Sequence, residues 1–227
     1  MLYHFDETET FIKSLDDIKS VVSLIEDSDK RVNSTLLKLS VVGLVTKFQV
    51  YIEKVLESFL YKLQHGNIKS SKLNSYIKLN SIFIQLNKEN DDLKKFRTYY
   101  DNLLDMEDKI IDELKKFGYL HNDIIIDDSF CFNIKFPIGK TGTKELSKLL
   151  KQFDGDDNPL AHDFSGINID KNKIDSMLGI RNSIVHQDIY NGTKQDIEDM
   201  IQTCLDIGKY IDEYIYQKTS SYLLDVK

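Results

Sequence analysis

Three side chains suited to RNA chemistry lie close together in the segment LGIRNSIVHQ, residues 178–187. On an α-helix, Asn182 and His186 are one turn apart and share a face, and the long side chain of Arg181 reaches them from one side. Arginine presents a permanently charged fork that fits phosphate oxygens, and histidine exchanges a proton near neutral pH. These groups can cut RNA without a metal. His186 takes the proton from a 2′-hydroxyl, which attacks the neighbouring phosphate, Arg181 stabilises the developing charge, and Asn182 holds the imidazole or a phosphate oxygen.

The same spacing also has a purely structural interpretation. In it, Arg181 forms a salt bridge along the helix face, and His186 caps the free carbonyls at the C-terminal end, where a cationic histidine is favourable. Arginine and histidine within a turn or so of each other are common in helices, so the spacing alone favours this interpretation. The elements around the segment are therefore needed to decide.

The rest of the sequence predicts an all-α protein. With 2 prolines and 10 glycines among 227 residues, little interrupts long helices. Apolar residues spaced three and four apart predict an amphipathic helix over about 7–26 and a long second helix from Ser28 or Asp29 to a stop at Gly66. Residues 71–117 are more polar but helical in pattern, with a break near the NKEND segment.

Irregular structure is predicted before the motif helix. Residues 118–142 combine β-branched and aromatic runs with turn residues, which indicates a short hairpin or an ordered loop. Thr143 is expected to cap a short helix that ends near 153. The motif helix should end at 191–192, and Thr193 with Asp196 forms an acidic capping box for a last long helix. No repeat or linker divides the chain, so we expect a single domain over 1–227.

Charge and composition limit the possible partners. A net charge of −7 and a pI near 5.3 argue against a protein that coats nucleic acid with its whole surface. The short stretch 135–151 is locally basic, with five lysines and a single acid, Glu145. Three of the lysines share a helix face that could follow a phosphate backbone, although a solvated face is the alternative interpretation. The lysines are Lys135, Lys140, Lys144, Lys148 and Lys151.

Several sites and compartments are not favoured. The IGKTGT segment has Ile134 where a phosphate-binding loop needs its first glycine, and DGDDNP has Pro159 where a calcium loop needs glycine. The remaining histidines are scattered, so we expect no metal and no cofactor. Cys131 and Cys204 form no disulfide or metal pattern, and the chain shows no signal or membrane-spanning segment. A reducing cytoplasm is the expected location, without membrane insertion.

The motif and the order of elements together resemble the HEPN superfamily. "LGIRNSIVHQ" resembles its R-x(4 to 6)-H signature, in the R-N-x-x-x-H form typical of bacterial defence and toxin branches. The long apolar second helix, the variable middle and the motif helix followed by a long final helix agree with a HEPN-like helical bundle, with 66–170 as a variable insert region. Within the superfamily, the chain is most similar to the MAE_28990/MAE_18760-type or RiboL-PSP-type proteins, which carry a loop or short-hairpin insert before the motif helix.

The resemblance implies specific roles. Arg181 and His186 would be the catalytic pair and Asn182 the supporting polar residue. HEPN ribonucleases are generally homodimers whose motifs face each other in a cleft, and they leave a 2′,3′-cyclic phosphate without a metal. Some relatives keep an acidic residue on the second helix that points at the motif. Glu53 is assigned this supporting role here, in competition with Gln49.

Three positions depart from the pattern. Val185 and Gln187 stand where relatives often have alanine and glycine. Asp188 stands where the members silenced by AMP addition carry tyrosine, and Tyr190 lies too far along the chain. That mode of control is therefore not expected.

The sequence thus predicts a metal-independent endoribonuclease. We expect it to act as a homodimer in the bacterial cytoplasm, as a toxin or phage-defence effector with a cognate antitoxin or defence partner. The lysines at 140, 144, 148 and 151 would guide the RNA substrate. One alternative is a non-catalytic HEPN module that binds RNA, a nucleotide or a partner protein. Another is a structural helical protein in which the motif is coincidental.

Overall fold

The computed structural model describes residues 3–25, 29–82, 84–85, 118, 123–136, 142–164, 166–167 and 169–223. The chain forms two compact units. The first unit comprises residues 1–58, 134–150 and 157–217, and the second comprises 59–133, 151–156 and 218–227. The helices α2 (Lys30–His65) and α7 (Lys194–Leu223) contribute residues to both units. The single domain over 1–227 stays a prediction.

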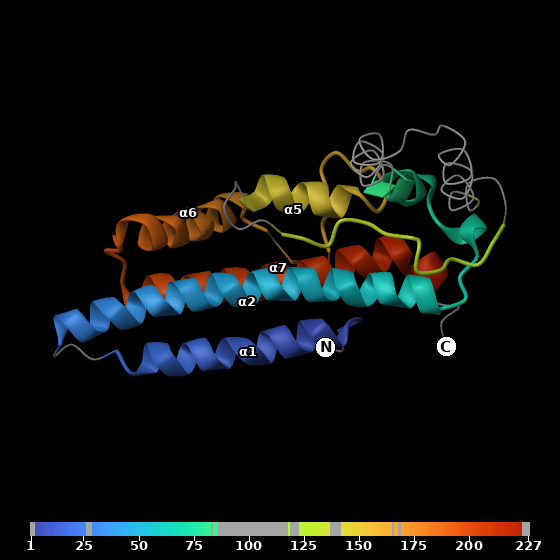
Figure 1. Cartoon of the computed structure of the whole chain (residues 1–227). Coiled ribbons are helices and arrows are strands. Elements are labelled where there is room, and N and C mark those ends of the chain that lie inside the picture. Colours follow the sequence, from blue (N-terminus) through green and yellow to red (C-terminus); the bar gives the residue numbers. More distant parts are fainter. Residues whose placement is uncertain are drawn as a thin grey trace, which may run out of the picture. The chain divides into compact units, whose positions relative to one another are not determined.

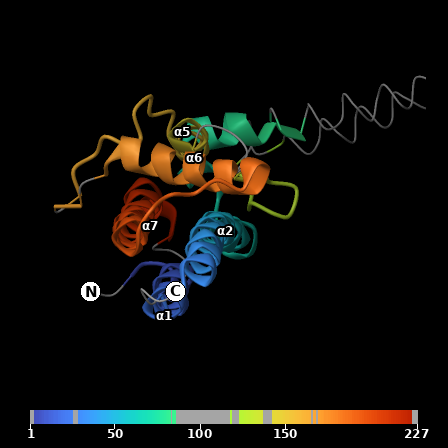
Figure 2. The ribbon, with the colours of Figure 1, turned by 90° about the vertical axis from the view of Figure 1, so that its left-hand side faces the viewer.

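The first unit is a layered arrangement of helices (Figure 1). Its further helices are α1 (Asp6–Ser23), most of α5 (Gly142–Lys151) and α6 (Lys171–Gln187). In the view along the helices, α2 and α7 form the middle layer, with α1 on one side and α6 on the other (Figure 2). The all-α prediction is confirmed, and α6 is the helix that carries the motif.

Aromatic packing holds α1 against the middle layer. The Phe11 ring stacks on Tyr51 with centroids 4.4 Å apart, and Gly208 of α7 leaves room for Phe11, whose Cε1 lies 3.1 Å from an ideal Cβ there. Tyr51 Oη donates to the Gly208 carbonyl over 2.8 Å and lies 3.1 Å from Thr8 Oγ1. Burial raises the pKa of Tyr51 above its ordinary value, so the hydroxyl keeps the proton that it donates.

The long helix α2 is stabilised at its start by a side-chain cap. Asp29 Oδ1 accepts hydrogen bonds from the amides of Arg31 (3.0 Å) and Val32 (3.1 Å), which confirms the Asp29 alternative for the cap. The helix ends at His65, as expected before Gly66. After the helix, Asn67 adopts the left-handed conformation, with φ 54°. Gly66 does not adopt this conformation.

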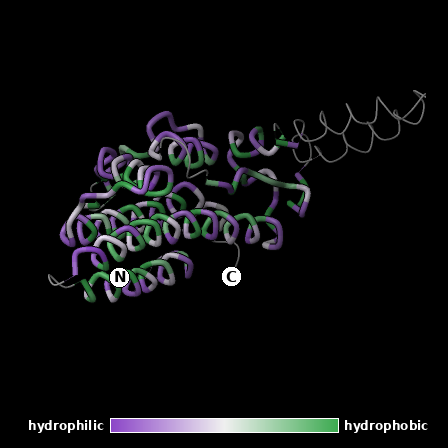
Figure 3. Tube along the Cα trace, turned by 60° about the vertical axis from the view of Figure 1, so that its left-hand side comes forward, coloured by the Kyte–Doolittle hydropathy of each residue, from purple (hydrophilic) through white to green (hydrophobic). Residues whose placement is uncertain are grey.

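The hydropathy of α2 agrees with a core helix. In Figure 3, hydrophobic and hydrophilic positions alternate around the helices, as one-sided burial requires. Within the described residues, α2 is the one helix long and apolar enough to cross a membrane, a test that core helices of soluble proteins also pass. One face of α2 is fully buried, at Val41, Leu44, Val45, Phe48, Ile52 and Val55.

The second unit pairs the segment before α5 with the segment after α2. Lys69 and Ile125 form an isolated antiparallel bridge, flanked by 2.8 Å hydrogen bonds from Ser70 N to Ile124 O and from Ile126 N to Ile68 O. The described residues 123–136 therefore form the ordered loop predicted for 118–142 and not the hairpin, because the backbone of 124–126 pairs with 68–70 and not with another part of the same segment. Residues 75–82 are helical as predicted, while 86–117, including NKEND, lie outside the described residues.

The start of α5 differs from its prediction. The helix begins at Gly142, and Thr143, predicted to be the cap, lies inside it. The cap comes from another helix, because Asp175 of α6 accepts hydrogen bonds from Thr143 N (2.8 Å) and Thr143 Oγ1 (2.7 Å). A Cβ at position 142 would overlap the Leu178 side chain, so glycine allows this close approach. α5 is thereby fastened to the motif helix.

The connection between α6 and α7 also differs in part. α6 starts at the side-chain cap Asp170 and ends at Gln187, several residues before the predicted 191–192. The acidic capping box of α7 is confirmed, since Asp196 Oδ2 accepts from Thr193 N (2.6 Å) and Asp196 N donates to Thr193 Oγ1 (3.3 Å). The hydrogen bonds from Thr193 lower the pKa of Asp196 below its ordinary value.

Candidate functional site

The orientation of α6 is set by its apolar residues. Ile174, Met177, Leu178 and Ile184 are buried and define the inner face of the helix. At 100° per residue, Arg181 falls within this buried arc, whereas Asn182 and His186 lie on a flank that reaches solvent. Val185, the apolar residue directly before His186, is 49% exposed. The motif helix therefore presents an apolar side chain to solvent beside His186.

Arg181 and Asn182 are in direct contact. Arg181 Nη1 donates a hydrogen bond to Asn182 Oδ1 over 3.1 Å. The Nε atom of Arg181 is buried and has no hydrogen-bond partner, and no carboxylate pairs with the guanidinium within the described parts of the chain. Buried donors without a partner are uncommon in native proteins. The salt bridge required by the structural interpretation is therefore not formed by any described residue.

His186 occupies an exposed position in the last turn of α6. Among the described residues, its ring makes neither a hydrogen bond nor an ion pair. Two carbonyls near this helix end are satisfied by the backbone and not by His186, with Asp188 N donating to Ile184 O (3.0 Å) and Ile189 N donating to Ser183 O (3.5 Å). The imidazole is thus available to a ligand, one turn from Asn182 and on the same face.

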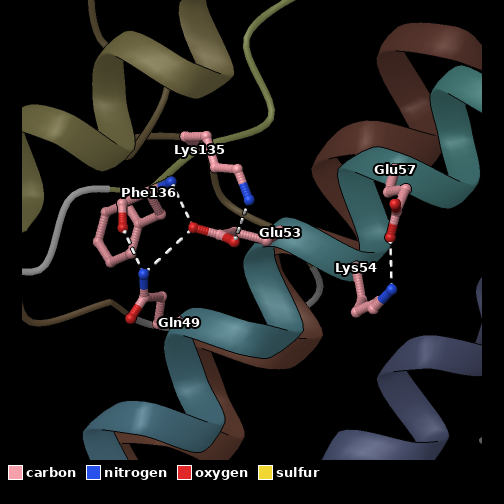
Figure 4. A network of polar contacts seen from close by, with 6 residues as sticks. All are labelled: Gln49, Glu53, Lys54, Glu57, Lys135 and Phe136. Carbon is pink, nitrogen blue, oxygen red and sulfur yellow. Dashed lines mark hydrogen bonds and ion pairs between the residues drawn. The ribbon is translucent and has the colours of Figure 1, made fainter.

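Glu53 takes part in a different network from the one predicted (Figure 4). Its Oε1 accepts from Gln49 Nε2 and Phe136 N, both over 3.1 Å, and its Oε2 accepts from Lys135 Nζ over 3.1 Å. Gln49 Nε2 also donates to Phe136 O over 3.0 Å. These contacts fasten 135–136 to α2. Within the described chain, neither Glu53 nor Gln49 bonds to the motif, so the expected support of the motif by Glu53 is not seen in its contacts.

Hydrogen bonding also decides the ionisation of Glu53. Partial burial acts to raise the pKa of the carboxyl group, but the bonds from Phe136, Lys135 and Gln49 outweigh this effect. The pKa of Glu53 consequently lies below its ordinary value. An ionised carboxylate is the form that accepts three hydrogen bonds, which suits a structural role in holding the segment before α5.

The predicted RNA-binding lysines differ in their availability. Lys144 is exposed and has no ion-pair partner among the described residues, and Lys148 is exposed but pairs with Glu145 at 2.8 Å. Lys151 is only half exposed at the end of α5, and Lys135 is engaged by Glu53. Lys140 lies outside the described residues. The exposed charges that remain are Lys144 and Lys148, one turn apart on α5.

A residue that the sequence analysis did not single out contacts the end of the motif helix. Lys38 of α2 donates from Nζ to both the carbonyl oxygen (2.7 Å) and Oδ1 (2.8 Å) of Asp188. Asp188 directly follows α6 and is two residues from His186. Lys38 is one of many lysines in the sequence, and nothing in its spacing pairs it with a residue 150 positions away.

The other flank of α6 borders a cavity of about 460 Å³ between α6 and α7. Met177, Ile180 and Met200 form its apolar part, and Tyr190, whose ring lies against Gly192, also lines it. Burial and the nearby Asp196 raise the pKa of Tyr190 to about 12, so this phenol stays protonated at neutral pH. No group of three His, Cys, Asp or Glu side chains is arranged to hold a metal ion in the described part of the chain.

Comparison with known proteins identifies the family. No curated protein and no solved structure matches the chain. The model of the family described as RiboL-PSP-HEPN matches residues 6–217 and so covers α1, α2, α5, the motif helix α6 and α7 up to residue 217. HEPN domains include ribonucleases as well as non-catalytic members. The match agrees with the all-α architecture and selects the second of the two resemblances noted from the motif: the chain belongs to the RiboL-PSP-HEPN family.

Proposed function

We propose that this protein is a metal-independent endoribonuclease whose reaction is carried out by Arg181 and His186. The observation that carries the proposal is the state of Arg181, a guanidinium with a buried Nε that lacks a partner and with no carboxylate beside it among the described residues. Arg181 as a whole is partly exposed, but a buried donor of a cation that lacks an acceptor is costly. A phosphate group would supply both the charge and the missing acceptor.

The chemistry follows from the two side chains. Neutral His186 accepts the proton of a ribose 2′-hydroxyl, the 2′-oxygen forms a bond to phosphorus, and the bond from phosphorus to the 5′-oxygen breaks. The leaving 5′-oxygen takes a proton from an acid, a role suited to the protonated His186 of a second copy. Arg181 stabilises the charge on the phosphoryl oxygens. Asn182 holds the guanidinium through the 3.1 Å bond. The products are a 2′,3′-cyclic phosphate and a 5′-hydroxyl.

Cleavage of total bacterial RNA in EDTA tests the proposal. Fragments ending in a 2′,3′-cyclic phosphate are the expected product. The rival function is a non-catalytic module that binds RNA, a nucleotide or a partner protein. It is favoured by one observation, namely that His186 bonds to neither Arg181 nor Asn182 among the described residues. RNA that is bound but remains intact would select this rival.

A second copy is proposed to complete the site. Among the exposed apolar side chains of the first unit, four lie on α6, just after it, or on the N-terminal half of α2: Val32, Leu39, Val185 and Ile189, at 51%, 60%, 49% and 55% exposed. Val32 and Leu39 share a face of α2, and the Lys38 contact to Asp188 brings this part of α2 to the end of α6. Exposed apolar side chains gathered beside a motif are typical of an interaction surface.

Val185→Asp is expected to weaken the homodimer. A carboxylate buried in an apolar interface without a partner is unfavourable, so the dissociation constant should rise at least about tenfold. Sedimentation equilibrium measures this change. Val50→Asp is the matched control. Val50 is 51% exposed on α2, so this variant introduces the same chemical change at an exposed position away from the motif. Equal effects of the two variants, or a wild type that is monomeric, would contradict the proposed interface.

The lysines of α5 are proposed to guide RNA to the motif. Reversing Lys144 and Lys148 to glutamate is expected to weaken RNA binding about tenfold or more at moderate salt and to lower the salt slope by about two, one for each lost phosphate contact. Titration of a fluorescent oligoribonucleotide at several salt concentrations measures both. Lys19→Glu with Lys54→Glu is the control, since both lysines are exposed and form i,i+3 ion pairs, as Lys148 does. Unchanged binding in the α5 variant would remove this role.

The cellular role is also a proposal. An RNA-cutting homodimer in the bacterial cytoplasm fits a toxin or phage-defence effector that a cognate antitoxin or defence partner restrains. Growth arrest on expression of the wild type, relieved by His186→Ala at equal protein level, is the expected result.

A further inference from the structure

Lys38 forms the only described side-chain bonds to the residue that ends the motif helix. Its Nζ lies 2.7 Å from the Asp188 carbonyl oxygen and 2.8 Å from Asp188 Oδ1. Both residues belong to the first unit. The Lys38 side chain is 21% exposed and that of Asp188 86%, so the ammonium group is largely sheltered while the carboxylate faces solvent.

The backbone at Asp188 explains why this contact matters. Asp188 adopts the left-handed conformation, with φ 54°, and its amide donates to Ile184 O over 3.0 Å, which closes the last turn of α6. A non-glycine residue in this conformation carries a strain of about 1 kcal/mol or more unless its surroundings hold it. The carbonyls of a last turn also lack partners inside the helix. Lys38 supplies a partner to the Asp188 carbonyl and links this turn to α2.

We propose that Lys38 is a positioning residue for His186, which it places by fastening the C-terminal turn of α6 to α2 through Asp188. The proposal rests on the proposed ribonuclease function. His186 lies in this same turn and has no bond of its own among the described residues, so its position is decided by the backbone that carries it. Ends of helices fray when nothing holds them. A base that must reach a 2′-hydroxyl within hydrogen-bond distance loses rate when its backbone shifts by about 1 Å.

A matched pair of variants tests the proposal. Lys38→Met removes the ammonium and keeps the aliphatic stem. Lys47→Met is the control, because Lys47 is also on α2 in the first unit and also pairs with an aspartate, Asp17, at 3.0 Å. Its side chain is 30% exposed, close to the value for Lys38. Lys38→Arg keeps the charge and the donors and should rescue most of the loss.

Two readouts are compared, one of which needs no catalysis. Hydrogen exchange of the backbone, followed by mass spectrometry of a peptide over 184–190, is expected to become faster in Lys38→Met and to stay unchanged in Lys47→Met. In RNA cleavage, Lys38→Met should lower kcat about tenfold or more while KM stays within about twofold, since positioning acts on the transition state and not on substrate binding.

Each contrary result has a distinct meaning. Unchanged exchange over 184–190 in Lys38→Met overturns the fastening of α6, whatever the activity. A rise in KM at constant kcat overturns the positioning role and indicates that Lys38 contacts the RNA instead. If wild type cuts no RNA in any form tested, the proposed function fails and the catalytic part of this inference fails with it, while the exchange data still decide whether Lys38 holds the helix end.

Discussion

Alanine in place of His186 is expected to lower the rate of metal-free RNA cleavage by at least about a hundredfold, because a general base in such a reaction contributes about 10²–10⁴-fold. The side chain is exposed and makes no described bond, so its removal should leave the thermal midpoint nearly unchanged. A large loss of rate at constant stability isolates the chemical role. Initial rates on a defined oligoribonucleotide in EDTA, with melting curves of the same preparations, measure the two effects.

The neighbouring positions supply the controls for this result. Gln187→Ala changes the next exposed residue of α6 and should retain nearly full activity. Arg181→Lys keeps the charge but loses the planar fork and the Nη1 bond to Asn182, and it should also lose most of the rate. If the rate of His186→Ala stays within about threefold of wild type, the imidazole is excluded as the base, because loss of a general base lowers the rate far more than threefold. A loss in Gln187→Ala as large as in His186→Ala would instead indicate damage to the helix end.

Asp212→Ala is expected to destabilise the protein by about 3 kcal/mol, the largest effect on stability that we predict from a polar group. Asp212 of α7 is 3% exposed, and its two oxygens accept hydrogen bonds from the backbone amides of His4 (2.9 Å) and Phe5 (3.1 Å). Phe5 is itself 1% exposed. Alanine would leave the buried amide of Phe5 and the partly buried amide of His4 without acceptors and release the segment before α1, so the free energy of unfolding in urea should fall.

An exposed aspartate on the same helix provides the comparison. Asp199 accepts a bond from Gln195 Nε2 over 3.0 Å at the surface, and Asp199→Ala should change the free energy of unfolding by no more than about 0.5 kcal/mol. Asp212→Asn keeps an acceptor oxygen and should recover part of the loss. A cost for Asp212→Ala no greater than that for Asp199→Ala would show that the amides of residues 4 and 5 find other partners.

Local patterns were enough for the features that depend on neighbouring residues. The capping box of Thr193 and Asp196 and the cap at Asp29 are confirmed, because these bonds form between residues two or three positions apart. The apolar spacing of α1 and α2 likewise predicted their buried faces, since one helix face repeats every three to four residues. The spacing of the motif predicted that Arg181, Asn182 and His186 lie on one helix, as they do on α6. The family match includes this helix.

Contacts between distant parts of the chain decided what the sequence left open or predicted wrongly. The support of the motif by Glu53 stays a prediction, while its described bonds go to Gln49 and residues 135–136, because the register of α2 against its neighbours depends on the packing of the whole unit. Asp175 replaced Thr143 as the cap of α5 for the same reason. The sequence by itself determined the order of the described helices and which of them carries the motif, since helix periodicity is local. Only the tertiary structure decided that Lys38 meets Asp188 at the end of α6, because a bond across 150 positions depends on which helices become neighbours.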